Sequence, residues 1–198
     1  INAALEGGAA GCFTQRERES YLPGKFYIKV DSTQRALRDL AKYYKKKFPI
    51  PVVALTGSVG KTTTKDMVAA VLGEKYRVLK TEGNLNNEIG VPMTLLRLSG
   101  EHEIAVLELG MNHAGEIDFL SPLVEPDVVL MTNIGDSHIE HFGSREKILE
   151  AKSEIFHHVK SGAFVVINGD DPLLNTLPGK LPYAFTRVGA GEGLDYRA

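Results

Sequence analysis

The sequence contains no tryptophan and a single cysteine, Cys12. One thiol cannot form an internal disulfide, so the fold is not a disulfide-stapled scaffold, and a reducing cytoplasm is the expected compartment. No apolar run is long enough to cross a bilayer, so we expect no membrane span. The charges are nearly balanced: Lys and Arg number 23 and Asp and Glu number 25, for a formal net charge of −2. No overall basic field therefore points to nucleic acid as a partner.

The chain of 198 residues is 43% apolar, which is enough for a buried core. It starts at Ile1 and ends at Ala198 after a strand-like run, so we expect it to be a piece of something longer. The first thirty residues read as a helix end and two short strands, too little to fold alone. Asp31 and Ser32 then offer N-cap chemistry for a helix that leads into the main domain. The solvated face of this helix is expected to carry Lys42, Lys45, Lys46 and Lys47.

An α/β fold with a mainly parallel sheet is predicted by short apolar strands that alternate with helical or loop segments. The expected strands are 52–56, 77–80, 104–109, 128–133 and 163–167. The helix after the first of these strands is expected to pack onto the sheet through Met67, Val68, Val71 and Leu72.

The segment 51–65, PVVALTGSVGKTTTK, is an apolar strand that runs into a glycine loop, a lysine and three threonines. Such a loop presents backbone N–H groups to an anion, and the helix that follows directs the positive end of its dipole to the same place. Lys61 can reach the β and γ phosphates of a nucleotide, and the Thr62 hydroxyl can bind the bridging Mg²⁺. The loop is a variant of the usual pattern, because Leu55 stands where the first glycine is expected.

Polar residues follow two further strands. Glu108 ends one apolar run, as the acidic metal ligand of a nucleotide site does, and the segment 132–138, TNIGDSH, follows another. Ligands of open α/β sheets bind at the carboxyl ends of the strands, so these residues are expected to meet the glycine loop. A carboxylate that merely caps the next helix is the alternative for Glu108. The residues expected to contact the nucleotide are Gly57, Ser58, Val59, Gly60, Lys61, Thr62, Thr63 and Asn133.

Lys152 interrupts the apolar stripe of an amphipathic helix at 144–160, which Ser144 is expected to cap. On the helix pattern alone, the favoured interpretation is a side chain that extends its ammonium group to water. The alternative is an amine that is modified or faces the phosphates, because a buried and unpaired ammonium is costly.

An asparagine-rich loop, TEGNLNNEIGVP, occupies 81–92. Its amides both donate and accept hydrogen bonds, which suits a sugar, peptide or uridyl ligand, and equally suits turns. The glycines of 189–193 precede no helix, so we expect a flexible loop there and no dinucleotide site. No partner can be assigned to the histidines outside these segments, which are His102, His141, His157 and His158.

These segments, in this order, resemble the bacterial Mur ligases, and most closely the members that add D-alanyl-D-alanine to UDP-N-acetylmuramoyl tripeptide. The resemblance rests on residues 56–65, 81–92, 108–117, 132–144 and 151–156. It covers 31 to about 169 well. It implies that residues 1–30 are the end of an amino-terminal substrate-binding domain, that 31–198 form the central ATP-binding domain, and that the carboxy-terminal ligase domain is absent.

The resemblance also implies the roles of the site residues. Lys61, Glu108, His138 and Lys152 would be catalytic. Thr62 and Glu108 would hold one Mg²⁺, and His138 would hold a second together with Lys152, which relatives carry as a carbamate. The residues implied to face the UDP-muramoyl peptide are Thr81, Asn84, Asn86, Asn87 and His113.

The implied reaction is ATP-dependent amide-bond formation through an acyl phosphate, in a monomeric enzyme of which this chain alone would be inactive. Two other functions stay open. A sister ligase could add an amino acid or extend a polyglutamate or cyanophycin-like chain. A regulatory P-loop ATPase could hydrolyse nucleotide to drive a partner, although it would not need His138 and Lys152. The isolated piece could also fold and bind nothing.

Overall fold

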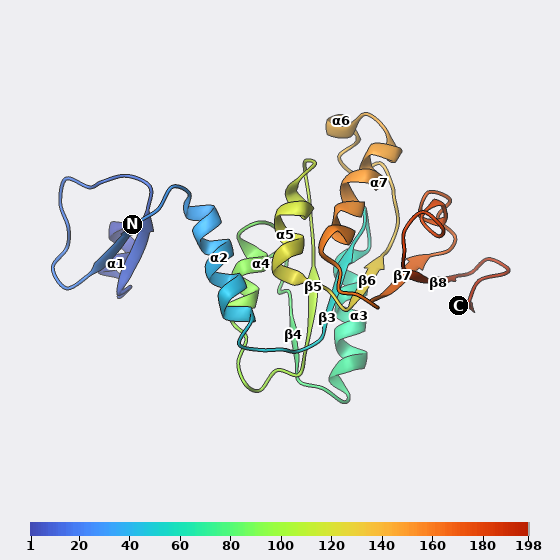
Figure 1. The fold of residues 1–198 in the computed structure, drawn as a ribbon, viewed down its shortest axis with the longest axis horizontal. Helices are drawn as coiled ribbons and strands as arrows, with labels where there is room; N and C mark the ends of the chain where they lie inside the picture. Colours follow the sequence, from blue (N-terminus) through green and yellow to red (C-terminus); the bar gives the residue numbers. More distant parts are fainter. Residues whose placement is uncertain (198) are drawn as a thin grey trace.

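The computed structural model describes residues 1–197 and has a seven-stranded parallel sheet with helices on both faces (Figure 1). The strand order is β4-β5-β3-β6-β7-β8-β9, and every pair is parallel. The strands are β3 (Val52–Thr56), β4 (Val78–Lys80), β5 (Ile104–Glu108), β6 (Val128–Met131), β7 (Phe164–Asn168), β8 (Ala184–Gly189) and β9 (Tyr196–Arg197). The predicted α/β class with a parallel sheet is confirmed.

The five strands predicted for the main domain are present, each with ends within two residues of the expected ones. β8 was not expected. Its sequence AFTRVG mixes polar and apolar residues, and none of its residues is fully buried, so it lacks the apolar run that marks the central strands.

The helices of the main domain are α2 (Thr33–Lys45), α3 (Lys61–Gly73), α4 (Gly90–Leu95), α5 (Glu116–Val124), α6 (Ile139–Phe142) and α7 (Arg145–Ser153), with 3₁₀ turns η1 (Glu154–His158) and η2 (Leu174–Thr176). Alternate residues of β3 point to opposite faces. Val52 and Ala54 join the large core formed with α4, α5 and α7. Val53 and Leu55 pack against α3 on the other face.

The buried stripe of α3 differs from the prediction. Met67 and Val71 are 65% and 74% exposed, whereas Lys65 and Ala69 are buried and Val68 packs on the sheet beside Leu72. The prediction was therefore right for Val68 and Leu72 and wrong for Met67 and Val71. A helix presents one stripe about every 3.6 residues, and here that stripe passes through the buried lysine.

Of the two predicted N-cap candidates for α2, Asp31 and Ser32, the structure uses Ser32, whose Oγ accepts a hydrogen bond from the Arg35 N–H at 3.2 Å. The prediction that Lys45 lies on a solvated face was wrong. The Lys45 side chain is buried, its Nζ donates to the Val124 carbonyl at 2.6 Å, and burial lowers its pKa. This lysine fastens α2 to the end of α5.

The first thirty residues form α1 (Asn2–Glu6) and a parallel pair of strands, β1 (Gly11–Thr14) and β2 (Phe26–Lys29). In Figure 1 this group stands at one end of the molecule and is joined to the main body through α2. Within residues 1–197, no helix combines the length and the apolar character that a membrane crossing requires.

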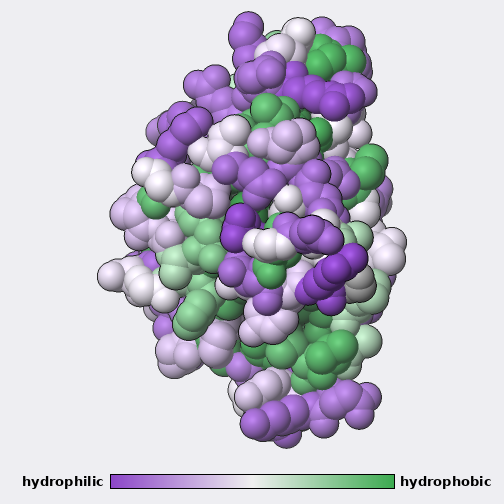
Figure 2. All heavy atoms as spheres, turned by 90° about the vertical axis from the view of Figure 1, so that its right-hand side faces the viewer, coloured by the Kyte–Doolittle hydropathy of each residue, from purple (hydrophilic) through white to green (hydrophobic). Residues whose placement is uncertain are grey.

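On the side that carries β8 and the carboxyl end of the chain, green hydrophobic patches break the hydrophilic surface (Figure 2). Large apolar residues exposed on β7 and β9 are Phe164 and Tyr196, at 64% and 67%. α3 covers the sheet over β3, β4 and β5, which leaves the strands beyond β6 less protected on that face.

Candidate active site

The glycine loop lies between β3 and α3, as predicted. Gly57 has φ 153°, and a Cβ there would lie 1.9 Å from the Thr132 Oγ1, so only glycine fits. Gly60 has φ 78° and precedes the first residue of α3, Lys61. The first N–H groups of a helix have no intrahelical acceptor, so the start of α3 offers donors to an anion.

Asn133 braces this loop. Its backbone carbonyl accepts from the Ser58 N–H at 3.0 Å, and its Oδ1 accepts from the Val59 N–H at 3.0 Å. Thr132 adds a hydrogen bond from its Oγ1 to the Val59 carbonyl at 2.7 Å. The backbone N–H groups of Ser58 and Val59 are thus already paired, and the first turn of α3, which includes Thr62 and Thr63, keeps the phosphate-facing donors.

Lys61 folds back over the loop. Its Nζ donates to the Gly57 carbonyl at 2.9 Å and to the Ser58 carbonyl at 3.1 Å. Burial lowers the pKa of Lys61, and the negative charge of Glu108 partly offsets this effect. An arriving phosphate can replace the two carbonyls as the partner of the amine.

Glu108 is the hub of the site. Its side chain is 1% exposed, and it accepts hydrogen bonds from the Thr62 Oγ1 at 3.0 Å and from the Asn86 Nδ2 at 2.7 Å. The Glu108 N–H donates to the Thr81 Oγ1 at 3.0 Å. The carboxylate therefore joins the glycine loop to the asparagine loop, and it does not cap the helix that follows.

A hydroxyl and a carboxylate so close together are oxygen ligands of the kind that Mg²⁺ prefers beside phosphate. The donor set of Thr62 and Glu108 thus fits the predicted magnesium ion. No group of three or more His, Cys, Asp or Glu residues between 1 and 197 is arranged to hold a metal by protein side chains alone.

Lys152 lies on α7 and is only 1% exposed. Its Nζ donates to the Gly57 carbonyl at 3.0 Å. The prediction that its ammonium extends to water was wrong, because the glycine loop covers the stripe in which it sits. Burial, with a smaller contribution from the charge of Lys61, lowers the pKa of Lys152 to about 7. The buried amine is therefore readily neutral and nucleophilic.

The lowered pKa predicts a pH-dependent stability. Unfolding exposes the amine and restores a pKa near 10.5, so between about pH 7 and that value the unfolded chain binds more protons than the folded chain. Stability from this group therefore rises with pH in that window. Relative to Lys152→Met, we expect the free energy of unfolding of the 198-residue chain to rise by up to about 1.4 kcal/mol per pH unit.

Urea denaturation in CO₂-free buffer at several pH values measures this difference. Lys75→Met, at an exposed position on the loop after α3, is the matched control and should run parallel to the unaltered chain. Parallel curves for Lys152→Met as well would contradict the prediction.

His138 and the asparagine loop line a polar cavity of about 200 Å³ beside Lys61. His138 has φ 66°, a left-handed conformation that costs energy in a non-glycine residue, and it begins the turn into α6. The residues that line the cavity are Lys61, Asn84, Asn86, Asn87, Gly110, Met111, Asn112, Glu116 and His138. The structure thus brings together residues that follow four different strands in the sequence, β3, β4, β5 and β6.

Two predicted substrate residues serve the protein itself. Thr81 is fully buried and holds the Glu108 N–H, so it does not face the cavity. Asn87 lines the cavity, but its Oδ1 also accepts from the Gly90 N–H at 2.8 Å at the start of α4. His113 is an exposed side chain whose Nδ1 lies 3.1 Å from the Glu116 Oε1.

Sequence reasoning missed Asn112 and Glu116. Both follow the Glu108 strand within eight residues, and an acidic side chain so soon after a strand that ends in a predicted metal ligand was the available signal. The sequence also assigned no partner to His157. In the structure, the His157 Nδ1 lies 2.6 Å from the Asp118 Oδ1.

The glycines of 189–193 surround a carboxylate. Asp170 accepts hydrogen bonds from the Ala190 N–H at 2.7 Å and the Gly191 N–H at 2.9 Å. The anion at this loop is thus a side chain of the protein.

A second cavity, of about 250 Å³ and more apolar, lies next to α3 at the ends of β6, β7 and β8. Its lining residues are Thr64, Leu130, Met131, Thr132, Val166, Ile167, Asn168 and Val188. Thr64 and Thr132 belong to the surroundings of the glycine loop, so this cavity adjoins that loop.

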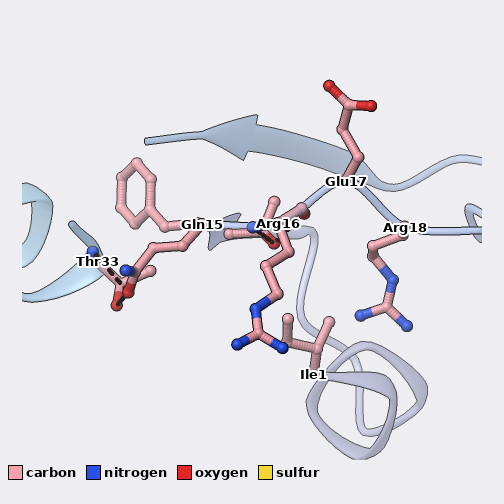
Figure 3. Close-up of a pocket in the computed structure, with 8 residues that line it drawn as sticks. Ile1, Gln15, Arg16, Glu17, Arg18 and Thr33 are labelled. Atoms are coloured by element: carbon pink, nitrogen blue, oxygen red, sulfur yellow. Dashed lines mark hydrogen bonds between the residues drawn. The ribbon is translucent and has the colours of Figure 1, made fainter. Parts of the chain in front are cut away.

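A larger hollow of about 740 Å³ lies near the amino-terminal end of the sequence, between the end of β1 and the start of α2 (Figure 3). Gln15 accepts a hydrogen bond from the Thr33 Oγ1 at 2.9 Å across it. Arg16 and Arg18 point toward the first helix, and Glu17 points away. These charged groups do not converge, so the polar cavity beside Lys61 remains the candidate active site.

The model of the Mur ligase middle domain matches residues 55–196, a range that includes every candidate site residue. The chain belongs to the Mur ligase family. The UDP-N-acetylmuramoyl-tripeptide–D-alanyl-D-alanine ligase of Bacillus subtilis is 48% identical to it over 174 residues, which are 88% of this chain and 38% of that protein. The chain thus spans less than half the length of this relative.

Solved structures of Mur ligases have the same fold as this chain. The MurF ligase from Thermotoga maritima, in complex with ADP, superimposes with a TM-score of 0.87 at 36% identity, over 98% of this chain and 44% of that one. A UDP-N-acetylmuramoylalanyl-D-glutamyl-2,6-diaminopimelate–D-alanyl-D-alanyl ligase from Acinetobacter baumannii gives 0.86 at 36% identity, over 98% of this chain and 42% of that one. The Mur ligase fold of this chain therefore rests on sequence and structure alike.

Proposed function

We propose that this chain is the ATP-binding part of a ligase that joins D-alanyl-D-alanine to UDP-N-acetylmuramoyl tripeptide. The observation that carries the proposal is the Thr62–Glu108–Asn86 chain of hydrogen bonds, which links a phosphate loop to an amide-lined cavity. A site that couples nucleotide to a second substrate needs such a link. The names of the relatives from Bacillus subtilis and Acinetobacter baumannii supply the substrates.

The reaction would begin when the terminal carboxylate of the tripeptide attacks the γ-phosphate of ATP, which yields an acyl phosphate and ADP. Two anions must approach each other, so the positive charge of Lys61 and the donors of α3 lower the barrier by neutralising charge and fixing the in-line geometry. The amine of D-alanyl-D-alanine would then attack the acyl carbon and displace phosphate.

Magnesium, held by Thr62 and Glu108 when bound, would neutralise charge on the phosphates. His138 and Lys152 form the proposed second metal site. Because the pKa of Lys152 is lowered to about 7, a substantial fraction of its amine is unprotonated near neutral pH, which supports its conversion to a carbamate, since only an unprotonated amine adds CO₂. The product is an anion that can bind metal, whereas the free ammonium cannot.

We assign a different substrate to each of the two cavities. The apolar cavity beside Thr64 would take the nucleoside of ATP, since its apolar walls and few polar groups suit a base. The polar cavity would take the end of the peptide, facing Asn84, Asn86 and Asn87. The third residue of that peptide would be a diamino acid, as in the name of the relative from Acinetobacter baumannii.

Residues 1–30 would belong to an amino-terminal substrate-binding domain and 31–198 to the central domain, in a monomeric cytoplasmic enzyme. Their separation in Figure 1 supports this division. The chain alone would not turn over, since its relatives have more than twice its length.

Mass spectrometry of the products tests the choice among ligases. The whole protein that carries this chain is given Mg-ATP and UDP-muramoyl tripeptide, with D-alanyl-D-alanine, single amino acids or glutamate. We expect a product only with the dipeptide. A product formed with single amino acids or glutamate in its place would favour the sister-ligase alternative.

A further inference from the structure

The polar cavity carries opposite charges on its walls. Lys61 is the lining lysine, and Glu116 is the one acidic side chain among the residues that the structure assigns to the lining. Glu108 lies beneath the cavity, 1% exposed, with both oxygens engaged by Thr62 and Asn86. The other polar lining groups are mostly asparagine amides, which carry no charge. A cation in this cavity would therefore meet Glu116.

The Glu116 carboxylate has capacity left for a ligand. Its Oε2 accepts from the Asn112 N–H at 2.7 Å, and its Oε1 lies 3.1 Å from the His113 Nδ1. A carboxylate offers about four acceptor positions, so these contacts leave free lone pairs. Its side chain is 32% exposed. Burial alone would raise its pKa, but the Asn112 N–H and the His113 ring outweigh this and hold the pKa of Glu116 below its usual value.

The helix does not need Glu116 as its cap. α5 begins at Glu116, but the Gly115 and Asp118 N–H groups donate to the Glu154 carboxylate at 2.7 Å and 3.0 Å. Glu154 therefore pairs with two of the amides at this helix end, and the Glu116 side chain lines the cavity instead.

We propose that Glu116 binds the side-chain ammonium of the third residue of the acceptor peptide, and so selects a diamino acid at that position. This inference rests on the proposed function. The carboxylate that reacts belongs to the third residue and must lie beside Lys61. The side chain of the same residue then extends into the cavity, and a stem of about four carbons carries its amine away from the reacting end. Lys61 and Glu116 bind the two oppositely charged ends of one residue.

The test uses the whole protein and two acceptors that differ only in this amine: UDP-muramoyl tripeptides that end in lysine or in norleucine. Glu116→Gln keeps the shape of the side chain and one acceptor oxygen for the Asn112 N–H. We expect it to raise KM for the lysine peptide by about 10- to 100-fold, the usual worth of a hydrogen bond to a charged group. We expect KM for the norleucine peptide, and kcat for both, to stay unchanged.

Glu140→Gln is the matched control, because Glu140 is exposed and absent from the cavity lining. It should alter neither KM. Equal increases for both peptides in Glu116→Gln would mean that Glu116 only shapes the 110–116 loop, and an increase in KM for D-alanyl-D-alanine alone would assign it to the other amine. Either result would overturn the inference while ligation by the unaltered protein continued. Absence of ligation in the unaltered protein would instead refute the proposed function, and the inference with it.

Discussion

Replacing Lys61 by alanine in the whole protein is expected to reduce kcat by about 10²- to 10³-fold. This is the usual cost of removing one group that stabilises developing charge. Among residues 1–197, the Lys61 Nζ donates to the Gly57 and Ser58 carbonyls and forms no salt bridge. Its loss therefore removes the positive charge over the phosphate loop without breaking a structural ion pair. Steady-state ligation rates at saturating substrates measure the effect.

Thermal unfolding of the same variant separates a chemical defect from a folding defect, and we expect a midpoint close to that of the unaltered protein. Lys75→Ala is the matched control, because this exposed lysine lies just after the same helix, where its Nζ approaches the Tyr76 ring. Unchanged ATP-dependent ligation in Lys61→Ala would remove the basis for placing the phosphates at this loop.

The second large effect is expected for Glu108→Gln. The substitution keeps the shape but removes the negative charge, and one of the two donors, Thr62 Oγ1 or Asn86 Nδ2, then faces an amide N–H₂ instead of an oxygen. We expect kcat to fall by about 100-fold or more and the Mg²⁺ concentration for half-maximal rate to rise. A magnesium titration of the ligation rate measures both.

Glu103→Gln serves as the control, because Glu103 lies just before the same strand, where it accepts from the Arg77 N–H at the opposite end of the sheet. It should leave the magnesium titration unchanged. A Glu108→Gln variant with a lowered rate but an unaltered magnesium requirement would contradict the role of Glu108 as a metal ligand and leave it only as an anchor of the asparagine loop.

Much of the site could be predicted because strand periodicity and sheet topology fix where strand ends meet. β3, β5 and β6 are short apolar runs, and the parallel arrangement brings the residues after them to one edge. The juxtaposition of Lys61, Glu108 and His138 follows from that geometry.

The direction of a side chain, and which segment packs over it, could not be predicted in the same way. Lys152 and Lys45 lie on amphipathic helices, and whether each ammonium reaches water depends on the segment that packs over it: the glycine loop for Lys152 and the end of α5 for Lys45. Met67 and Val71 were expected to be buried because they are apolar, but a single helix on that face of the sheet buries only one stripe.

The hydrogen-bond partners of the asparagines could not be predicted from the sequence either. Asn133 and Asn86 each act on a distant segment, the former on the glycine loop and the latter on Glu108. An amide can pair with backbone, side chain or ligand equally well, so its residue type alone does not reveal its partner. Glu116 was missed for a related reason, since its exposure to the cavity depends on Glu154 capping α5 in its place.

Phosphate release by the whole protein is the most direct test of the central claim that this site couples ATP to the joining of two other substrates. The protein is given Mg-ATP and UDP-muramoyl tripeptide, with and without D-alanyl-D-alanine. We predict sustained release only when both substrates are present, with one phosphate for each dipeptide joined. Steady ATP hydrolysis that is indifferent to both substrates would contradict the ligase and indicate a nucleotide-driven regulatory ATPase.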